Sequence, residues 1–179
     1  MGGSGSATWA DIVLRGLDRT NYFVPYEVHG EGGAGYVQTG AVKLAFAGLA
    51  QSIPADAAIV VVFGSRNGGG GYSPDSISKA ATDLYAQINK RAPGAKLLVI
   101  GPPRVDENVP NNILTIRDRL KIAATKAGAT FVDPIADEWF FGADAALIGS
   151  DGVHPTDAGH QYMAERILPF IKGLFAPLG

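Results

Sequence analysis

The chain has 179 residues, of which 46% are apolar and 18% charged, and it contains no cysteine. This length fits one domain with its own core, and the missing cysteines exclude a disulfide scaffold, a thiolate metal site and a cysteine nucleophile. A net charge of −2 gives no electrostatic case for a nucleic-acid partner. With no apolar run of about 20 residues and no signal-peptide pattern, we expect one soluble domain over residues 1–179 that does not enter a membrane.

Apolar spacing predicts alternating elements along the chain, after a glycine-rich segment at residues 1–7 that is expected to be flexible. In chain order these are a helix from Thr8, a strand at Tyr26–Val28, a helix over residues 42–49 that stops near Pro54, a strand at Ala57–Phe63, a helix capped by Ser73 that ends before Pro93, a strand at Lys96–Ile100, a helix at Ile113–Ala127 capped by Gly128, a strand at Thr130–Val132 and a helix from Thr156 to Phe175.

Two of the strands carry most of the information about fold class. Ala57–Phe63 and Lys96–Ile100 are apolar without alternation, which is typical of neighbouring parallel strands buried on both faces. Helices that alternate with such strands predict a three-layer α/β/α fold, with a parallel sheet between two helical layers. Ligands of such sheets bind beyond the carboxyl ends of the strands, where the loops begin at His29, Gly64, Gly101 and Asp133.

Asp151 and His154 are the first candidates for catalysis. They are three residues apart on a turn that contains Gly152 and Pro155. An aspartate so placed can accept from one imidazole nitrogen and leave the other to take a proton from a nucleophile. The alternative is a surface turn before a helix that is capped by Thr156.

Two glycine-rich loops offer hydrogen-bond donors. In Gly64–Gly71, Asn67 follows the most buried strand, where its amide is a candidate donor to an oxyanion. In Gly30–Gly35, one backbone N–H is a candidate second donor. The alternatives are a flexible loop and a tight turn. A P-loop is disfavoured because no Gly-Lys-Ser/Thr follows, and the match to a dinucleotide fingerprint is weak.

The remaining histidines, His29 and His160, are interpreted as structural. His154 and His160 are six residues apart and share no helical face for a metal ion, and no acidic cluster completes a site. The sequence therefore predicts neither a metal nor an organic cofactor.

Taken together, these loops resemble the SGNH (GDSL-like) hydrolase family. The run D-G-V-H-P-T-D-A-G-H from Asp151 to His160 is similar to that family's last motif, whose aspartate and histidine serve a serine nucleophile. The resemblance implies that Asn67 and Gly33 are the oxyanion donors, although Ser65 stands where the family has a glycine. Order and spacing agree over residues 9–175, and the pattern is most similar to small bacterial or bacteriophage members.

The start of the chain departs from the family, which opens with a buried central strand ending in Gly-Asp-Ser. This chain has no Gly-Asp-Ser, and Met1–Ser6 is similar to the loop that follows that serine. We interpret the chain as starting after the nucleophile, without the first central strand. An empty slot would cost roughly 1–3 kcal/mol per buried backbone group, so another segment, a re-paired sheet or another chain would have to fill it. Ser4 or Ser6 is the candidate substitute nucleophile, on a loop that is not expected to form a strand.

The leading hypothesis is a serine esterase that acts on a small-molecule or glycan ester through an acyl-enzyme. We expect His154 within about 10 Å of Asn67, because one acyl group must reach both. The alternative is a catalytically silent binding module that lacks the nucleophile and serves a phage or cell-surface assembly. A flavodoxin-like nucleotide binder is the third hypothesis.

Overall fold

The computed structural model describes residues 7–18, 25–64, 66–68, 71–104 and 107–175. Its contacts divide the chain into two compact units. The sheet unit comprises His29–Trp139, and the terminal unit comprises Met1–Val28 together with Phe140–Gly179. Ser4 and Ser6 lie outside the described residues, as does the expectation for residues 1–6.

The sheet unit contains three parallel strands in the order β1-β2-β3. They are β1 (Ile59–Phe63), β2 (Lys96–Ile100) and β3 (Thr130–Val132). Val61 of β1 pairs with Leu98 of β2, so the two apolar runs are parallel neighbours as the sequence predicts. This fold is therefore α/β, a parallel sheet flanked by helices.

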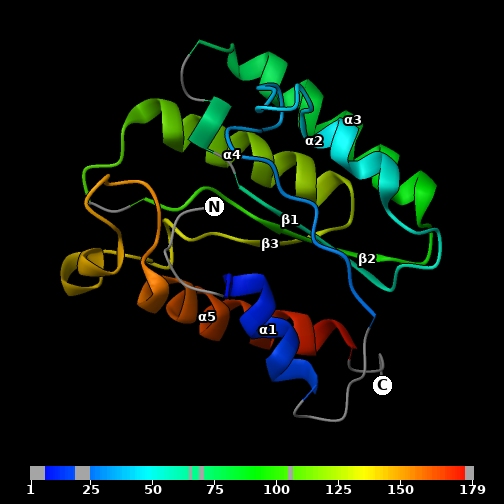
Figure 1. Cartoon of the computed structure of the whole chain (residues 1–179). Coiled ribbons are helices and arrows are strands. Elements are labelled where there is room, and N and C mark those ends of the chain that lie inside the picture. The colour runs from blue at the N-terminus through cyan, green and yellow to red at the C-terminus, as the bar shows by residue number, and fades with distance from the viewer. Residues whose placement is uncertain (1–6, 19–24, 65, 69–70, 105–106, 176–179) are drawn as a thin grey trace. The chain divides into compact units, whose positions relative to one another are not determined.

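Two long helices of the sheet unit, α3 (Pro74–Arg91) and α4 (Asn111–Lys126), lie side by side over the sheet (Figure 1). Between the helices and the sheet lies an apolar core, to which β1, β2, α3 and α4 contribute, among others, Val62, Val99, Ile88 and Leu120. Shorter elements complete this unit: α2 (Phe46–Leu49) and the 3-10 turns η1 (Ala50–Ser52) and η2 (Arg66–Gly68).

The ends of these two helices follow the sequence signals. The Ser73 hydroxyl accepts the Ser76 N–H at 3.2 Å, and Pro74 is the first helical residue of α3. Beyond α4, the N–H of Gly128 donates to the Thr125 carbonyl and that of Ala129 to the Ala124 carbonyl. This pair of bonds is the Schellman motif that a glycine at this position favours.

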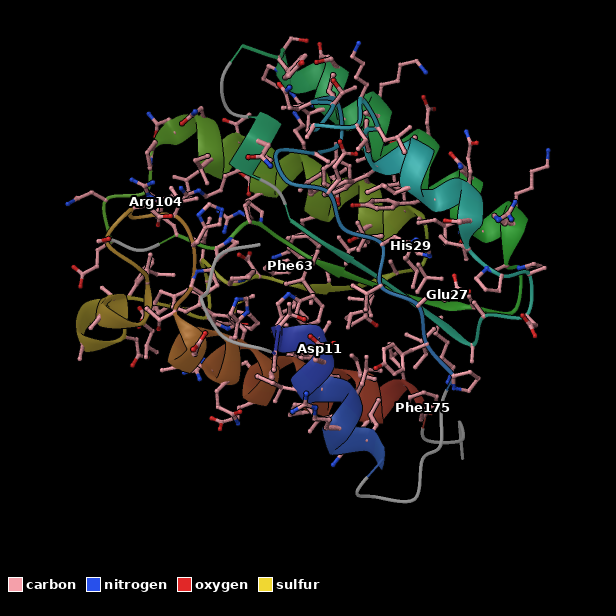
Figure 2. All side chains as sticks on the ribbon, viewed as in Figure 1. Asp11, Glu27, His29, Phe63, Arg104 and Phe175 are labelled. Carbon is pink, nitrogen blue, oxygen red and sulfur yellow. The ribbon has the colours of Figure 1, made fainter. Side chains whose placement is uncertain are left out.

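The terminal unit pairs α1 (Trp9–Asp18) with α5 (Asp157–Phe175), and the 3-10 segment η3 (Gly142–Leu147) precedes α5. The two helices lie side by side in Figure 1, and a Cβ at Gly16 would stand 3.0 Å from Leu168. Thr8 and Asp11 cap α1 reciprocally, since the Thr8 N–H donates to the Asp11 carboxylate at 2.8 Å and the Asp11 N–H to the Thr8 hydroxyl at 3.3 Å. Asp11 is labelled on α1 in Figure 2.

Two expectations about elements are wrong. Tyr26–Val28 is irregular rather than a strand, so the described part of the sheet has three strands where the sequence predicts four. Tyr26 is 56% and Val28 49% exposed, and apolar side chains alone make no strand where no neighbour supplies hydrogen bonds. The helix expected over residues 42–49 starts only at Phe46, because a turn with Lys43 at φ +62° occupies its first half.

Within the residues that the structure describes, no helix is both long enough and apolar enough to cross a membrane.

Candidate active site

Asp151 and His154 form a hydrogen-bonded pair in the terminal unit. Asp151 Oδ2 lies 2.7 Å from His154 Nδ1. Its other oxygen, Oδ1, accepts the backbone N–H groups of Val153 and His154, both at 2.9 Å. One carboxylate thus closes the turn and orients the ring.

The backbone N–H of His154, followed by its side chain and the Val153 N–H, holds the pKa of Asp151 well below its usual range. The aspartate is therefore charged at neutral pH, and it favours the imidazole tautomer with its proton on Nδ1. Nε2 is then the nitrogen that can accept a proton. Both side chains are half exposed to solvent, His154 at 50% and Asp151 at 52%.

The turn that carries this pair is tied to the start of α5. The Gly149 N–H donates to the His154 carbonyl at 2.8 Å, and Gly152 takes φ +66°, a conformation that glycine adopts without strain. Thr156 caps α5, because its hydroxyl accepts the Gly159 N–H at 3.1 Å and donates to the Leu147 carbonyl at 2.9 Å. The helix cap expected as an alternative to a catalytic turn is thus present together with the Asp–His pair.

Gly159 is a residue of this region that the sequence analysis missed. A Cβ there would overlap the carbonyl oxygen of Leu147 and stand 2.8 Å from Cβ of Pro155. Only glycine fits between α5 and the segment before the turn. Gly159 lies within the run from Asp151 to His160, but the run does not show why glycine is needed there, because the close approach is made by a backbone atom twelve residues away.

The two glycine-rich loops are joined within the sheet unit. β1 ends at Phe63, and the Gly64 N–H still donates to the Ile100 carbonyl at 3.1 Å before the chain turns into η2. Asn67 lies in η2, and its side-chain Nδ2 donates to the Ala34 carbonyl at 2.8 Å. The two predicted oxyanion donors therefore lie on loops that one hydrogen bond connects.

The second candidate donor is the backbone N–H of Gly33, an exposed residue. It takes φ +81°, and a Cβ would stand 3.9 Å from Gly40 Cα. Its N–H donates to no acceptor within the described part of the chain. An amide nitrogen such as Asn67 Nδ2 carries two hydrogens, and the bond to Ala34 uses one of them to orient the side chain.

The structure thus joins Asp151 to His154 in one unit and Asn67 to the Gly33 loop in the other. The convergence of the two pairs on one ester stays a prediction. Asp133, at the head of the loop after β3, serves the structure instead. It is buried, pairs with Arg117 at 3.1 Å and accepts the Ala136 N–H at 3.2 Å.

The other two histidines, His160 and His29, lie near groups outside the Asp151–His154 turn. His160 is 5% exposed, and its Nδ1 accepts the Trp9 N–H at 3.2 Å, which ties the first turn of α1 to α5. His29, labelled in Figure 2, is exposed, with Nδ1 3.4 Å from the Ser52 hydroxyl. Across the described residues, no three His, Asp or Glu side chains gather as a metal site.

Comparisons with known proteins cover nearly the whole chain. The model of the GDSL-like lipase/acylhydrolase family matches residues 1–162. The GDSL lipase Rv0518 of Mycobacterium tuberculosis is 43% identical over 174 residues, which cover 96% of this chain and 75% of that protein.

Solved structures share the fold. A protein from Lactobacillus plantarum superposes with a TM-score of 0.76 at 20% identity, over 97% of this chain and 91% of that one. Axe2, an acetylxylan esterase from Geobacillus stearothermophilus, gives 0.71 at 14% identity, over 98% and 85%.

Proposed function

We propose that this chain, which belongs to the GDSL-like lipase/acylhydrolase family, is a serine hydrolase that cleaves carboxylic esters through an acyl-enzyme. The observation that carries the proposal is the bond between Asp151 and His154. The 2.7 Å contact at Nδ1, together with an aspartate that keeps its charge, prepares Nε2 as a general base. A surface turn that needed only a cap would not require the imidazole.

In the first half-reaction, His154 Nε2 takes the proton of a serine hydroxyl as its oxygen attacks the ester carbonyl carbon. The tetrahedral intermediate collapses when the bond to the alcohol oxygen breaks, and His154 returns the proton to that oxygen. Water then repeats both steps on the acyl-serine, releasing the carboxylic acid. Asp151 stays a carboxylate throughout and stabilises the imidazolium that forms twice in each turnover.

Charge builds on the former carbonyl oxygen in both tetrahedral intermediates. We assign its stabilisation to the backbone N–H of Gly33 and the side-chain amide of Asn67. Gly33 supports this role because it is an exposed residue whose N–H has no acceptor among the described residues, and Asn67 because its bond to Ala34 fixes the direction of its side chain. Donors that are held in place before the reaction lower the barrier without a reorganisation cost.

For the substrate, we propose an ester of a small acyl group, on an alcohol or on a glycan. Because one fold hosts many substrates, the test compares nitrophenyl acetate with an acetylated xylan, the substrate named for Axe2. Neither reaction calls for a metal ion or an organic cofactor.

The proposal is tested by labelling the protein with a fluorophosphonate, which reacts with an activated serine. With Ser4 or Ser6 in place of the Gly-Asp-Ser serine, we expect the wild type to be labelled and His154→Ala to lose most of the label. His29→Ala is the matched control. It also removes an exposed histidine, but one whose Nδ1 lies near the Ser52 hydroxyl rather than a carboxylate.

Mass spectrometry of the labelled peptide then identifies the nucleophile, for which Ser4 and Ser6 are the candidates in this chain. A wild type without label and without hydrolysis of either substrate would reject the hydrolase and support the binding-module alternative.

A further inference from the structure

A buried pair of tyrosines lies beneath the Gly33 loop. Tyr36 follows Gly33 by three residues and is 6% exposed, while Tyr85 lies within α3 and is fully buried. Their hydroxyl oxygens are 2.6 Å apart, and their rings meet edge to face with centroids 6.0 Å apart. Phe46 packs on the Tyr36 ring at 5.1 Å. Tyr36 is thus a buried anchor of the Gly30–Gly35 loop, in which the Gly35 N–H also donates to the Gln38 carbonyl.

The hydrogen bond between the two hydroxyls is expected to add little to the free energy of unfolding. Burial raises the pKa of both phenols, so both are neutral and each carries one hydrogen. One hydroxyl donates to the other, and the second hydrogen meets no acceptor in the described part of the chain. A buried polar pair with one unsatisfied hydrogen stabilises a fold little more than two apolar rings of the same shape. What the bond does provide is a fixed separation between the loop and α3.

That separation matters because both proposed oxyanion donors are attached to the Gly33 loop. Gly33 belongs to this loop, and Asn67 Nδ2 donates to the carbonyl of Ala34, the residue after Gly33. The Tyr36–Tyr85 bond fixes the loop to α3, so it acts on the Gly33 N–H through the loop backbone and on Asn67 through Ala34.

We propose that Tyr36 and Tyr85 are positioning residues that hold the Gly33 N–H and the Asn67 amide at the spacing one oxyanion needs. This inference rests on the proposed hydrolase function. Misplacement of catalytic groups by about 1 Å can lower a rate about 100-fold. Because oxyanion donors act in the transition state more than on the bound ester, the loss falls on kcat rather than on KM.

The test uses Tyr36→Phe, Tyr85→Phe and the double variant, which keep the rings and remove the hydroxyls. We expect kcat for nitrophenyl acetate to fall about 10-fold in each single variant, with KM changed by less than about twofold. The double variant should match the singles, since all three lose the same bond. Tyr26→Phe, a change at an exposed tyrosine, is the control and should behave as the wild type.

Thermal unfolding and kinetics together separate the outcomes. Should a single variant unfold because it leaves one buried hydroxyl alone, the double variant, which leaves none, carries the test. A kcat equal to that of the wild type in the folded variants would overturn the positioning role and leave the hydrolase proposal standing. A loss of activity that merely follows the fraction unfolded would show a structural role only. A wild type without hydrolysis and without fluorophosphonate label would refute both proposals.

Discussion

Asp151→Asn separates the two tasks that the structure assigns to the Asp151 side chain. The asparagine oxygen can still accept the Val153 and His154 backbone N–H groups that Oδ1 accepts at 2.9 Å. The turn should therefore keep its shape. The amide nitrogen, however, replaces Oδ2 opposite His154 Nδ1, where the wild-type contact is 2.7 Å. Since that nitrogen can only donate, it favours the tautomer whose proton sits on Nε2, which cannot act as a base.

A wrong tautomer lowers kcat about 10⁴-fold in the best-studied serine triad. We expect a smaller loss here, about 10²–10³-fold, because Asp151 is half exposed and water competes for the ring. The assay is the hydrolysis of nitrophenyl acetate, with Asp83→Asn as the control that neutralises another surface carboxylate.

The pH dependence of kcat is a second, independent test of the role of Asp151. The hydrogen bonds from His154 lower the pKa of Asp151 in the folded state, so the carboxylate keeps its charge as the pH falls through the usual aspartate range. We expect the acid limb of the wild-type profile to report the base and not this aspartate. A variant with more than half of the wild-type kcat, or one that regains activity at low pH, would refute the assignment of Asp151 as the orienting group.

Three further changes test the site and its supports. Asn67→Ala should lower kcat about 100-fold with KM little changed, whereas Asn89→Ala, which loses a similar amide-to-carbonyl bond on α3, should have no effect on kcat. Gly159→Ala should lower the free energy of unfolding by about 1–3 kcal/mol in urea, because its Cβ meets backbone, while Gly173→Ala in the same helix has open space and should not destabilise. Thr8→Ala removes the hydroxyl that caps α1 and should cost about 1 kcal/mol in the same assay.

The sequence correctly predicted those elements that depend on residues close together in the chain. Ser73 before Pro74 and Gly128 after α4 mark helix ends by chemistry within a few residues, and the structure places the ends there. The apolar run at Lys96–Ile100 indicates a strand buried on both faces, because only such a strand tolerates apolar residues without alternation. Asp151 and His154 are equally local, since three residues and a glycine turn suffice to bring them together.

Elements that need a distant partner could not be predicted in the same way. Tyr26–Val28 has strand-like residues, but a strand exists only when another strand accepts its hydrogen bonds, and the described part of the sheet provides none. The bond from Asn67 to Ala34 and the Tyr36–Tyr85 pair join residues more than thirty positions apart, which no local pattern encodes. The sequence by itself therefore identified the candidate site residues along the chain, from the two glycine-rich loops to the Asp151–His154 turn. Only the tertiary structure decided which carbonyl orients Asn67 and which helix anchors the Gly33 loop, because packing, not sequence distance, selects those partners.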